Sequence, residues 1–180
     1  MTSMPGNTPL SYCPACGEHH FQRDSPKSHR CSVCRFTLYR NASAAVAAIF
    51  VRGSEVLLTV RAHAPAEGKL DLPGGFVDND ETAEQALERE VREELGVEVQ
   101  AYEYFCSFPN LNSYGGLDYH VLDLFYIVDV ERHGLERLVL GDEIADCRWL
   151  DIASMHFEDI AFPSTRKALQ RYQLKSPGRL

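Results

Sequence analysis

The sequence predicts an α/β protein in which a mixed sheet lies between two helical layers, an α/β/α sandwich, joined to a small N-terminal zinc ribbon. From residue 41 onward, short apolar runs suited to strands alternate with two helical segments, and two Cys-x-x-Cys pairs come before them. With 44% hydrophobic and 24% charged residues, the 180-residue chain can form one well-buried domain and a small module that needs its own staple. We therefore expect a zinc ribbon with its N-terminal tail over 1–40 and the larger domain over 41–180.

The first element is a pair of cysteine knuckles separated by fourteen residues. This spacing predicts one Zn²⁺ ion held tetrahedrally by four thiolates, a closed and therefore structural site. Two disulfides are the alternative, but the segment lacks a secretory context. About 30 residues bury too little apolar surface to fold alone, so metal binding would supply the folding free energy. His19, His20 and His29 could each replace a thiolate, although beside four cysteines we expect them at the surface. The expected zinc ligands are Cys13, Cys16, Cys31 and Cys34.

Beyond the ribbon, apolar runs and turn residues predict the strands. Two short runs flank Arg52-Gly53-Ser54, which predicts a β-hairpin. A third run leads into a Pro-Gly-Gly turn, and later segments are rich in β-branched and aromatic residues. We expect strands within residues 44–51, 55–61, 70–72, 97–108, 120–130 and 148–150.

The segment from Thr82 to Leu95 carries the end signals of a helix. Thr82 and Gln85 form a capping box, and Gly96 suits a left-handed C-terminal cap. The apolar stripe that should pack on the sheet consists of Leu87, Val91 and Leu95.

A final helix is expected from Ser164 to about Tyr172. Ser164 follows Pro163 and can serve as its N-cap, with Phe162 packed beneath the helix. The two cysteines outside the knuckles, Cys106 and Cys147, are expected to be buried free thiols.

The first helix also places three carboxylates within an arc of about 100°. Beside a core such crowding requires a counter-charge, and a hard divalent cation with oxygen ligands is the natural one. Arg89 precedes Glu93 by four residues and can neutralise part of the cluster. A solvated acidic helix face is the alternative. The residues expected to bind Mg²⁺ or Mn²⁺ are Glu90, Glu93 and Glu94.

From Gly75 to Val97 the residues follow the order Gly-x5-Glu-x7-Arg-Glu-Val-x-Glu-Glu-x-Gly-Val. This order resembles the Nudix box, and every fixed position of that family's signature is filled. The resemblance implies a Nudix sandwich over roughly residues 41–170. It also implies a metal-dependent hydrolase that cleaves the pyrophosphate linkage of a nucleoside diphosphate derivative by water attack on phosphorus. The ribbon is similar to that of Nudix enzymes related to NADH pyrophosphatases.

The resemblance further implies roles for residues around the glutamates. Glu81 and Arg89 would support the loop and orient the metal ligands, and Gly74 and Gly75 would let the backbone approach the metal and phosphates. A further acid from outside the box often serves as a ligand or general base, and Glu143 is the candidate. The alternatives for that role are Asp142 and Glu136.

The sequence leaves several substrates open. NADH pyrophosphatases carry a Ser-Gln-Pro-Trp-Pro-Phe-Pro-x-Ser motif after the box, and residues 106–113 keep only its Phe-Pro pair, which weakens the case for NADH. NADH, ADP-ribose and related small nucleotides lead. The alternatives are an RNA cap-removing Nudix enzyme that contacts nucleic acid through the ribbon, and a non-catalytic nucleotide sensor. Aromatic residues that could stack on a base, or more often form core, are Tyr104, Phe108, Tyr114 and Tyr119.

Charge and hydropathy bear on partners and location. The formal net charge of −8 disfavours non-specific nucleic-acid binding. Residues 11–40 carry five cations and two anions, a formal +3, which falls to about +1 once four thiolates and Zn²⁺ are included. We expect no export signal, no membrane span and a cytoplasmic protein. The family resemblance implies that a homodimer could form.

Overall fold

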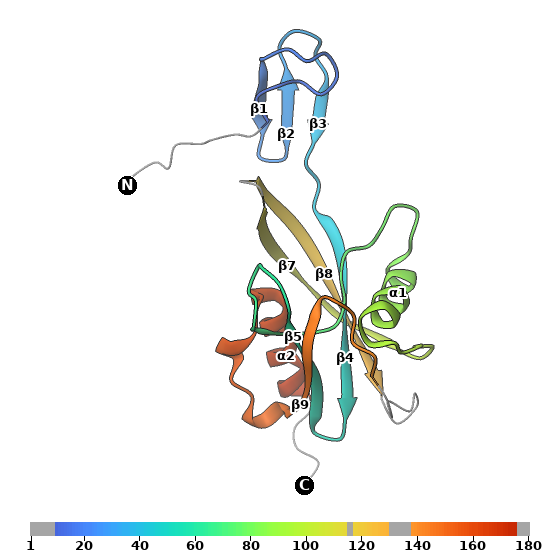
Figure 1. Ribbon diagram of the computed structural model, residues 1–180. Helices are drawn as coiled ribbons and strands as arrows, with labels where there is room; N and C mark the ends of the chain where they lie inside the picture. Colours follow the sequence, from blue (N-terminus) through green and yellow to red (C-terminus); the bar gives the residue numbers. More distant parts are fainter. Residues whose placement is uncertain (1–9, 115–116, 130–137, 176–180) are drawn as a thin grey trace. The chain divides into compact units, whose positions relative to one another are not determined.

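The computed structural model describes residues 10–114, 117–129 and 138–175 (Figure 1). The described residues form two compact units. Unit 1 contains those up to Ala42 together with Leu111–His120, and unit 2 contains Ser43–Asn110 and those from Val121 onward. Unit 1 therefore draws on two separate stretches of the sequence.

Unit 1 is built around a three-stranded antiparallel sheet. Its strands are β1 (Phe21–Ser25), β2 (Ser28–Cys31) and β3 (Thr37–Tyr39), in that spatial order. Phe21 lies opposite Cys31 in the register, and both are buried with Cys13 in a small core. So small a core needs additional stabilisation to hold the unit together.

His29 is buried, contrary to the surface position expected for it. The side chains of a strand alternate between faces, so His29 and Cys31 of β2 point to the same inner face. The His29 ring lies 5.6 Å from the Phe21 ring, and neither ring nitrogen has a hydrogen-bond partner. The expectation failed because strand alternation, rather than polarity, decides which side of this sheet His29 faces.

Unit 2 is built around a six-stranded mixed sheet. Its strand order is β6-β5-β4-β8-β7, with β9 paired to β5 as well. Strand β4 runs parallel to β8, whereas β5 is antiparallel to β4, β6 and β9. The strands are β4 (Ser43–Arg52), β5 (Glu55–Arg61), β6 (Leu70–Asp71), β7 (Glu103–Tyr114), β8 (Leu117–Asp129) and β9 (Ile144–Asp151).

Helices cover both faces of this sheet. Alternation along β4 sends Phe50 into a core cluster with α1 (Ala83–Leu95) and Ile49 into a second cluster with α2 (Pro163–Lys175). Two short 3₁₀ turns, η2 (Ile152–Ser154) and η3 (Phe157–Asp159), precede α2. The expected α/β/α sandwich is therefore confirmed (Figure 1).

Several local expectations differ from the structure. The strand expected from residue 97 begins at Glu103, because Val97 and Val99 are buried in the α1-side core without strand pairing. Ser164 lies within α2 rather than capping it, and its hydroxyl donates to the buried carboxylate of Asp123. Cys106 is a buried free thiol as expected, whereas Cys147 is only half-buried.

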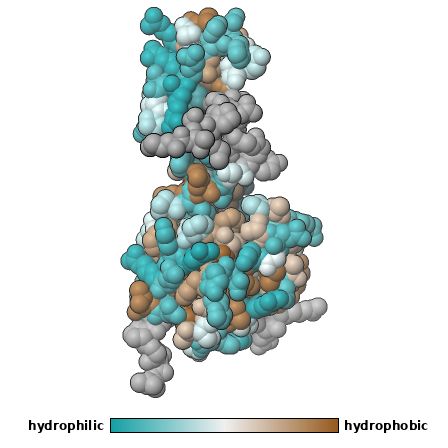
Figure 2. All heavy atoms as spheres, turned by 90° about the vertical axis from the view of Figure 1, so that its left-hand side faces the viewer, coloured by the Kyte–Doolittle hydropathy of each residue, from teal (hydrophilic) through white to brown (hydrophobic). Residues whose placement is uncertain are grey.

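The described part of the chain contains two α-helices, α1 and α2. In that part of the chain, no helix is both long and apolar enough to cross a bilayer. Figure 2 shows hydrophobic residues in small groups among hydrophilic ones on the face that it presents.

Candidate active site

A glycine loop forms one wall of the candidate site. The N–H groups of Ala48 and Val46 in β4 donate to the carbonyls of Pro73 (2.9 Å) and Gly75 (2.8 Å). Gly74 has a φ of 146°, and a Cβ there would lie 2.1 Å from the Val46 carbonyl oxygen. Only glycine permits this close approach of the loop to the strand.

Helix α1 forms the opposite wall, and its ends match the expected signals. The hydroxyl of Thr82 accepts a hydrogen bond from the Gln85 N–H, and the Gln85 side chain accepts one from the Thr82 N–H. Gly96 adopts the left-handed conformation at the C-cap. The stripe of Leu87, Val91 and Leu95 is fully buried, which fixes the rotation of the helix and places the glutamates at its edge.

Arg89 connects three of the acidic side chains. Its guanidinium donates two 2.9 Å hydrogen bonds to the Glu81 carboxylate and one of 2.8 Å to Glu90. It also donates to the carbonyl of Phe76 on the glycine loop. The expected pair with Glu93 is longer, at 3.4 Å, and Glu93 is 58% exposed. The hydrogen bonds from Arg89 lower the pKa of Glu81 and hold Arg89 in its charged form.

Glu94 and Glu90 face the loop from the helix. The Gly74 N–H donates to Glu94 Oε2 at 2.9 Å, and Gly75 lies so close to Glu90 that a Cβ would be 2.5 Å from its Oε1. Burial raises the pKa of Glu94 to about 8, and the charges of Glu90, Asp71 and Glu143 add to this rise. Burial also raises the pKa of Glu90, against the hydrogen bond from Arg89. Both groups are in an environment that disfavours their negative charge.

The segment before β9 brings Glu143 to the same place. The N–H groups of Val139 and Gly141 donate to the carbonyls of Leu95 and Glu94 at the end of α1, both at 2.9 Å. Two residues later, Glu143 is close enough for its charge to raise the pKa of both Glu90 and Glu94. Asp142 is an exposed neighbour, and Glu136 lies outside the described residues.

The carboxylates of this site have the chemistry that a hard divalent cation requires, whereas in the part of the chain that the structure describes the four cysteines are the group already gathered closely enough to hold a metal ion. The side-chain ligands that Glu90, Glu93 and Glu94 offer are carboxylate oxygens, which Mg²⁺ and Mn²⁺ prefer. A cation would also relieve the unfavourable ionisation of the two partly buried glutamates, Glu90 and Glu94, since a positive charge favours their deprotonated forms.

The four cysteines of unit 1 also come together. Their sulfurs all lie within 4.8 Å of one another, with 3.6 Å between Cys13 and Cys34 and 3.7 Å between Cys16 and Cys31. Tetrahedral zinc with Zn–S bonds of about 2.3 Å requires sulfurs about 3.8 Å apart, whereas a disulfide requires about 2.05 Å. The thiols are free, so the geometry is compatible with zinc and not with the disulfide alternative.

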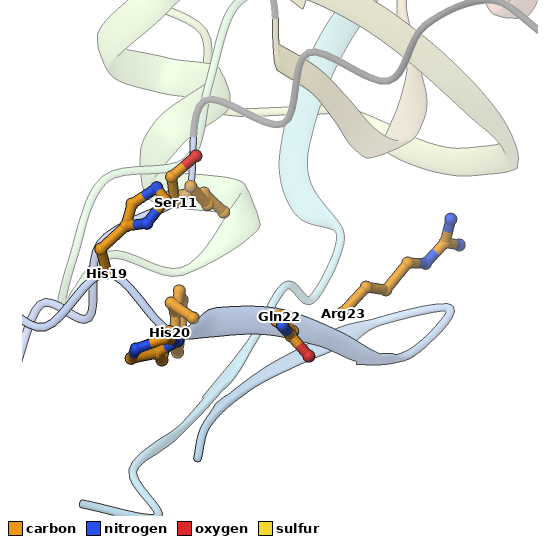
Figure 3. Close-up of a pocket in the computed structure, with 7 residues that line it drawn as sticks. Ser11, His19, His20, Gln22 and Arg23 are labelled. Atoms are coloured by element: carbon orange, nitrogen blue, oxygen red, sulfur yellow. The ribbon is translucent and has the colours of Figure 1, made fainter. Parts of the chain in front are cut away.

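Unit 1 also contains a hollow, which is lined by residues 10, 11 and 19–23. Figure 3 shows Ser11 and His19 side by side in its wall, while Arg23 extends away along β1. None of the seven lining residues is a predicted catalytic or metal-binding residue.

The aromatic candidates for base stacking are only partly available. Phe108 packs against the α2-side core and lies 6.4 Å from the Phe125 ring, so core is its role. Tyr104 and Tyr119 are 52% and 41% exposed. The side chain of Tyr114 lies outside the described residues.

Two contributors to the site were not expected from the sequence. Asp71 is 9% exposed and accepts a hydrogen bond from the Leu72 N–H at the start of the glycine loop. An acidic residue between two leucines before Pro-Gly-Gly was the available signal. Gly141 packs so tightly on α1 that a Cβ would lie 2.7 Å from the Glu93 carbonyl oxygen, and nothing in its local sequence marks this.

Comparisons with known proteins find one matching family model and several relatives. The model of the NUDIX domain matches residues 40–172. The chain is 29% identical to an NAD-capped RNA hydrolase of Stutzerimonas stutzeri over 91% of this chain and 54% of the relative. It is 31% identical to an ADP-ribose pyrophosphatase of Methanocaldococcus jannaschii over 67% of this chain and 69% of the relative. It thus spans about half the length of the first of these relatives. A solved NUDIX hydrolase from Nitrosomonas europaea shares 26% identity, covers 92% of each chain and superposes with a TM-score of 0.67.

Proposed function

The chain belongs to the Nudix family, and on this premise we propose that it is a Mg²⁺-dependent hydrolase of the pyrophosphate linkage in a nucleoside diphosphate derivative. The observation that supports this most strongly is the position of Glu90 and Glu94 against Gly74 and Gly75. Two partly buried carboxylates lie against the loop there, since the Gly74 N–H donates to Glu94 and a Cβ at Gly75 would occupy the space of the Glu90 carboxylate.

Each residue of the site has a role in this proposal. Glu90, Glu93 and Glu94 would hold the divalent cation, which when bound neutralises charge on the phosphate oxygens and acidifies water. Arg89, fixed by Glu81, holds Glu90 in place and ties α1 to the loop at Phe76. Glu143 would accept the proton of the attacking water. Glu143 is exposed, and it is close enough for its charge to raise the pKa of both partly buried glutamates.

A small nucleotide such as ADP-ribose is the substrate we favour. The relative from Methanocaldococcus jannaschii is named an ADP-ribose pyrophosphatase. The stretch 106–113 lacks most of the NADH pyrophosphatase motif, and its partly buried Phe108 packs against the α2-side core. Both observations favour ADP-ribose over NADH.

An RNA cap is the second candidate substrate, because the Stutzerimonas relative is named an NAD-capped RNA hydrolase. The register of the unit 1 sheet places Gln22, Arg30 and Thr37 in one row on a single face. Tyr39, two residues beyond Thr37, is on the same face and is 62% exposed. Such a face could contact a phosphate backbone and stack on a base. A non-catalytic sensor is the third candidate, and the complete Nudix box argues against it.

We propose that zinc occupies the cysteine site as a structural ion, that the protein is cytoplasmic and that it could function as a homodimer. Zinc would contribute the folding free energy that the small core of unit 1 lacks. Metal analysis and the mass of the purified protein in solution test the zinc and the dimer.

A substrate panel tests the proposed activity. The full chain is incubated with Mg²⁺ and with ADP-ribose, NADH, diadenosine polyphosphates, nucleoside triphosphates or NAD-capped RNA, and the products are separated by chromatography. We expect AMP and ribose 5-phosphate from ADP-ribose. Faster cleavage of NAD-capped RNA, with RNA binding that weakens steeply with salt, would favour the second candidate instead. No cleavage of any substrate with Mg²⁺ or Mn²⁺ would refute the proposal.

A further inference from the structure

A buried carboxylate joins the glycine loop to helix α2. Asp71 is the last residue of β6, and its Oδ1 accepts hydrogen bonds from the Leu72 N–H (2.9 Å) and the Thr165 hydroxyl (3.1 Å). Its Oδ2 lies 3.3 Å from Nη1 of Arg61. Asp71, Leu72 and Thr165 are all at least nine-tenths buried. These contacts join residues 94 positions apart in the sequence.

The contacts of Asp71 lie directly before the glycine loop. The carbonyls of Pro73 and Gly75 are held by β4, but the Leu72 N–H at the loop's entrance is held by Asp71. Two residues after Leu72, the Gly74 N–H donates to Glu94. A change in the orientation of the Leu72 peptide would therefore reach the Gly74 N–H through Pro73, whose φ is fixed by its ring.

Backbone contacts also join β6 to the residues before α2, so the connection between them does not depend on the Asp71 side chain alone. The Ala161 N–H donates to the Leu70 carbonyl at 2.7 Å, and Leu70 forms a bridge with Ile160. Lys69 is 3.5 Å from the exposed carboxylate of Asp159. Of these connections, the Asp71 carboxylate is the one bonded to the loop's own N–H.

We propose that Asp71 is a positioning residue for the metal site, which sets the glycine loop against Glu94 by bridging the Leu72 N–H and the Thr165 hydroxyl. The inference rests on the proposed function, since it assigns to Asp71 an effect on cation binding. A purely structural role would change the melting temperature of the protein and leave the metal affinity of the folded chain unchanged.

Direct metal binding by the full chain tests this. Mn²⁺ alone is the probe, and its free concentration is followed by electron paramagnetic resonance at fixed pH, with thermal melting measured in parallel. Asp71→Ala removes the acceptor and should weaken Mn²⁺ binding about tenfold, as expected for loss of a group that orients metal ligands. Asp71→Asn keeps an oxygen for Leu72 and Thr165 and should stay within about threefold of the wild type. Asp159→Ala is the matched control and should bind like the wild type.

Thr165 gives a second route should Asp71→Ala fail to fold. Thr165→Val removes only the hydroxyl and should weaken Mn²⁺ binding about threefold, and Thr165→Ser should restore it. Wild-type affinity in folded Asp71→Ala and in Thr165→Val would overturn this inference, as would equal losses in Asp71→Asn and Asp71→Ala. A wild-type chain that neither binds Mn²⁺ nor cleaves any substrate of the panel would instead refute the proposed function, and this inference with it.

Discussion

Gly75→Ala is the sharpest test of the metal site, because the added carbon meets one side chain of the cluster. The new Cβ would lie 2.5 Å from Oε1, 2.6 Å from Cδ and 2.7 Å from Oε2 of Glu90. Ordinary contact begins at 3.4 Å, so the Glu90 carboxylate must move by about 0.9 Å. Gly75 does not adopt a positive φ, so alanine is compatible with its backbone.

A displacement of this size exceeds what a metal site tolerates. Ligand distances in such sites hold to within about 0.2 Å, and a misplacement of about 1 Å can cost ~100-fold in rate. We therefore expect Gly75→Ala to lose about 100-fold in turnover of ADP-ribose with Mg²⁺, with weaker Mn²⁺ binding and little change in melting temperature.

Gly53→Ala is the matched control for Gly75→Ala. Gly53 has a φ of 62° in the β4–β5 turn, and its Cβ would meet nothing within 4 Å, so alanine there should cost about 1–2 kcal/mol of stability and leave turnover unchanged. Gly74→Ala is uninformative, because its Cβ meets backbone of β4 and should disrupt the fold. Turnover and Mn²⁺ affinity of Gly75→Ala within threefold of the wild type would refute the assignment of Glu90 to the site.

The remaining predictions concern the other ligands and the pH dependence. Glu93→Gln and Glu94→Gln should each raise the Mg²⁺ concentration for half-maximal activity about tenfold or more, and native metal dependence in both would contradict the site. Glu143→Gln should lower kcat far more than it raises KM, and an unchanged kcat would reject Glu143 as the base. The pKa of Glu94 is raised to about 8, so protonation competes with the cation below that pH, and Mn²⁺ affinity should rise between pH 6.5 and 8.5. Without metal, the same raised pKa means that the free energy of unfolding falls as pH rises from about 4.5 to 8. A Mn²⁺ affinity that does not change with pH would contradict the assignment of the pH dependence to Glu94. The purified chain should contain about one zinc ion, and Cys31→Ser should lose it and loosen unit 1 while ADP-ribose cleavage persists.

Local patterns predicted those parts of the fold that local chemistry decides. The capping box at Thr82, the glycine at position 96 and the buried stripe of α1 follow from contacts within a few residues, and the structure has all three. The β4–β5 hairpin follows likewise from the turn at Gly53. The spacing of the cysteines predicted that their four sulfurs would come together, and they lie within 4.8 Å of one another.

The features that the sequence missed depend on contacts between distant segments. Asp71 meets Thr165, and Asp123 meets Ser164, so two carboxylates that appear solvent-facing in sequence are buried against α2. The Ser164 hydroxyl is therefore used for a long-range hydrogen bond instead of a helix cap. The prediction of a surface position for His29 failed for the same reason, since the burial of this side chain depends on the pairing of three strands.

The composition of unit 1 limits how the chain can be shortened. The end of β7 and the start of β8 belong to the same compact unit as the N-terminal stretch, and the Arg40 guanidinium donates to the Asp118 carbonyl. Removing the residues before Ser43 would expose the β7–β8 residues that pack in unit 1. Aggregation or loss of activity in such a fragment would therefore say little about the ribbon itself. Cysteine substitutions in the full chain separate loss of the ribbon from exposure of the β7–β8 segment. They remove the expected zinc ligands while leaving both sequence stretches of unit 1 present.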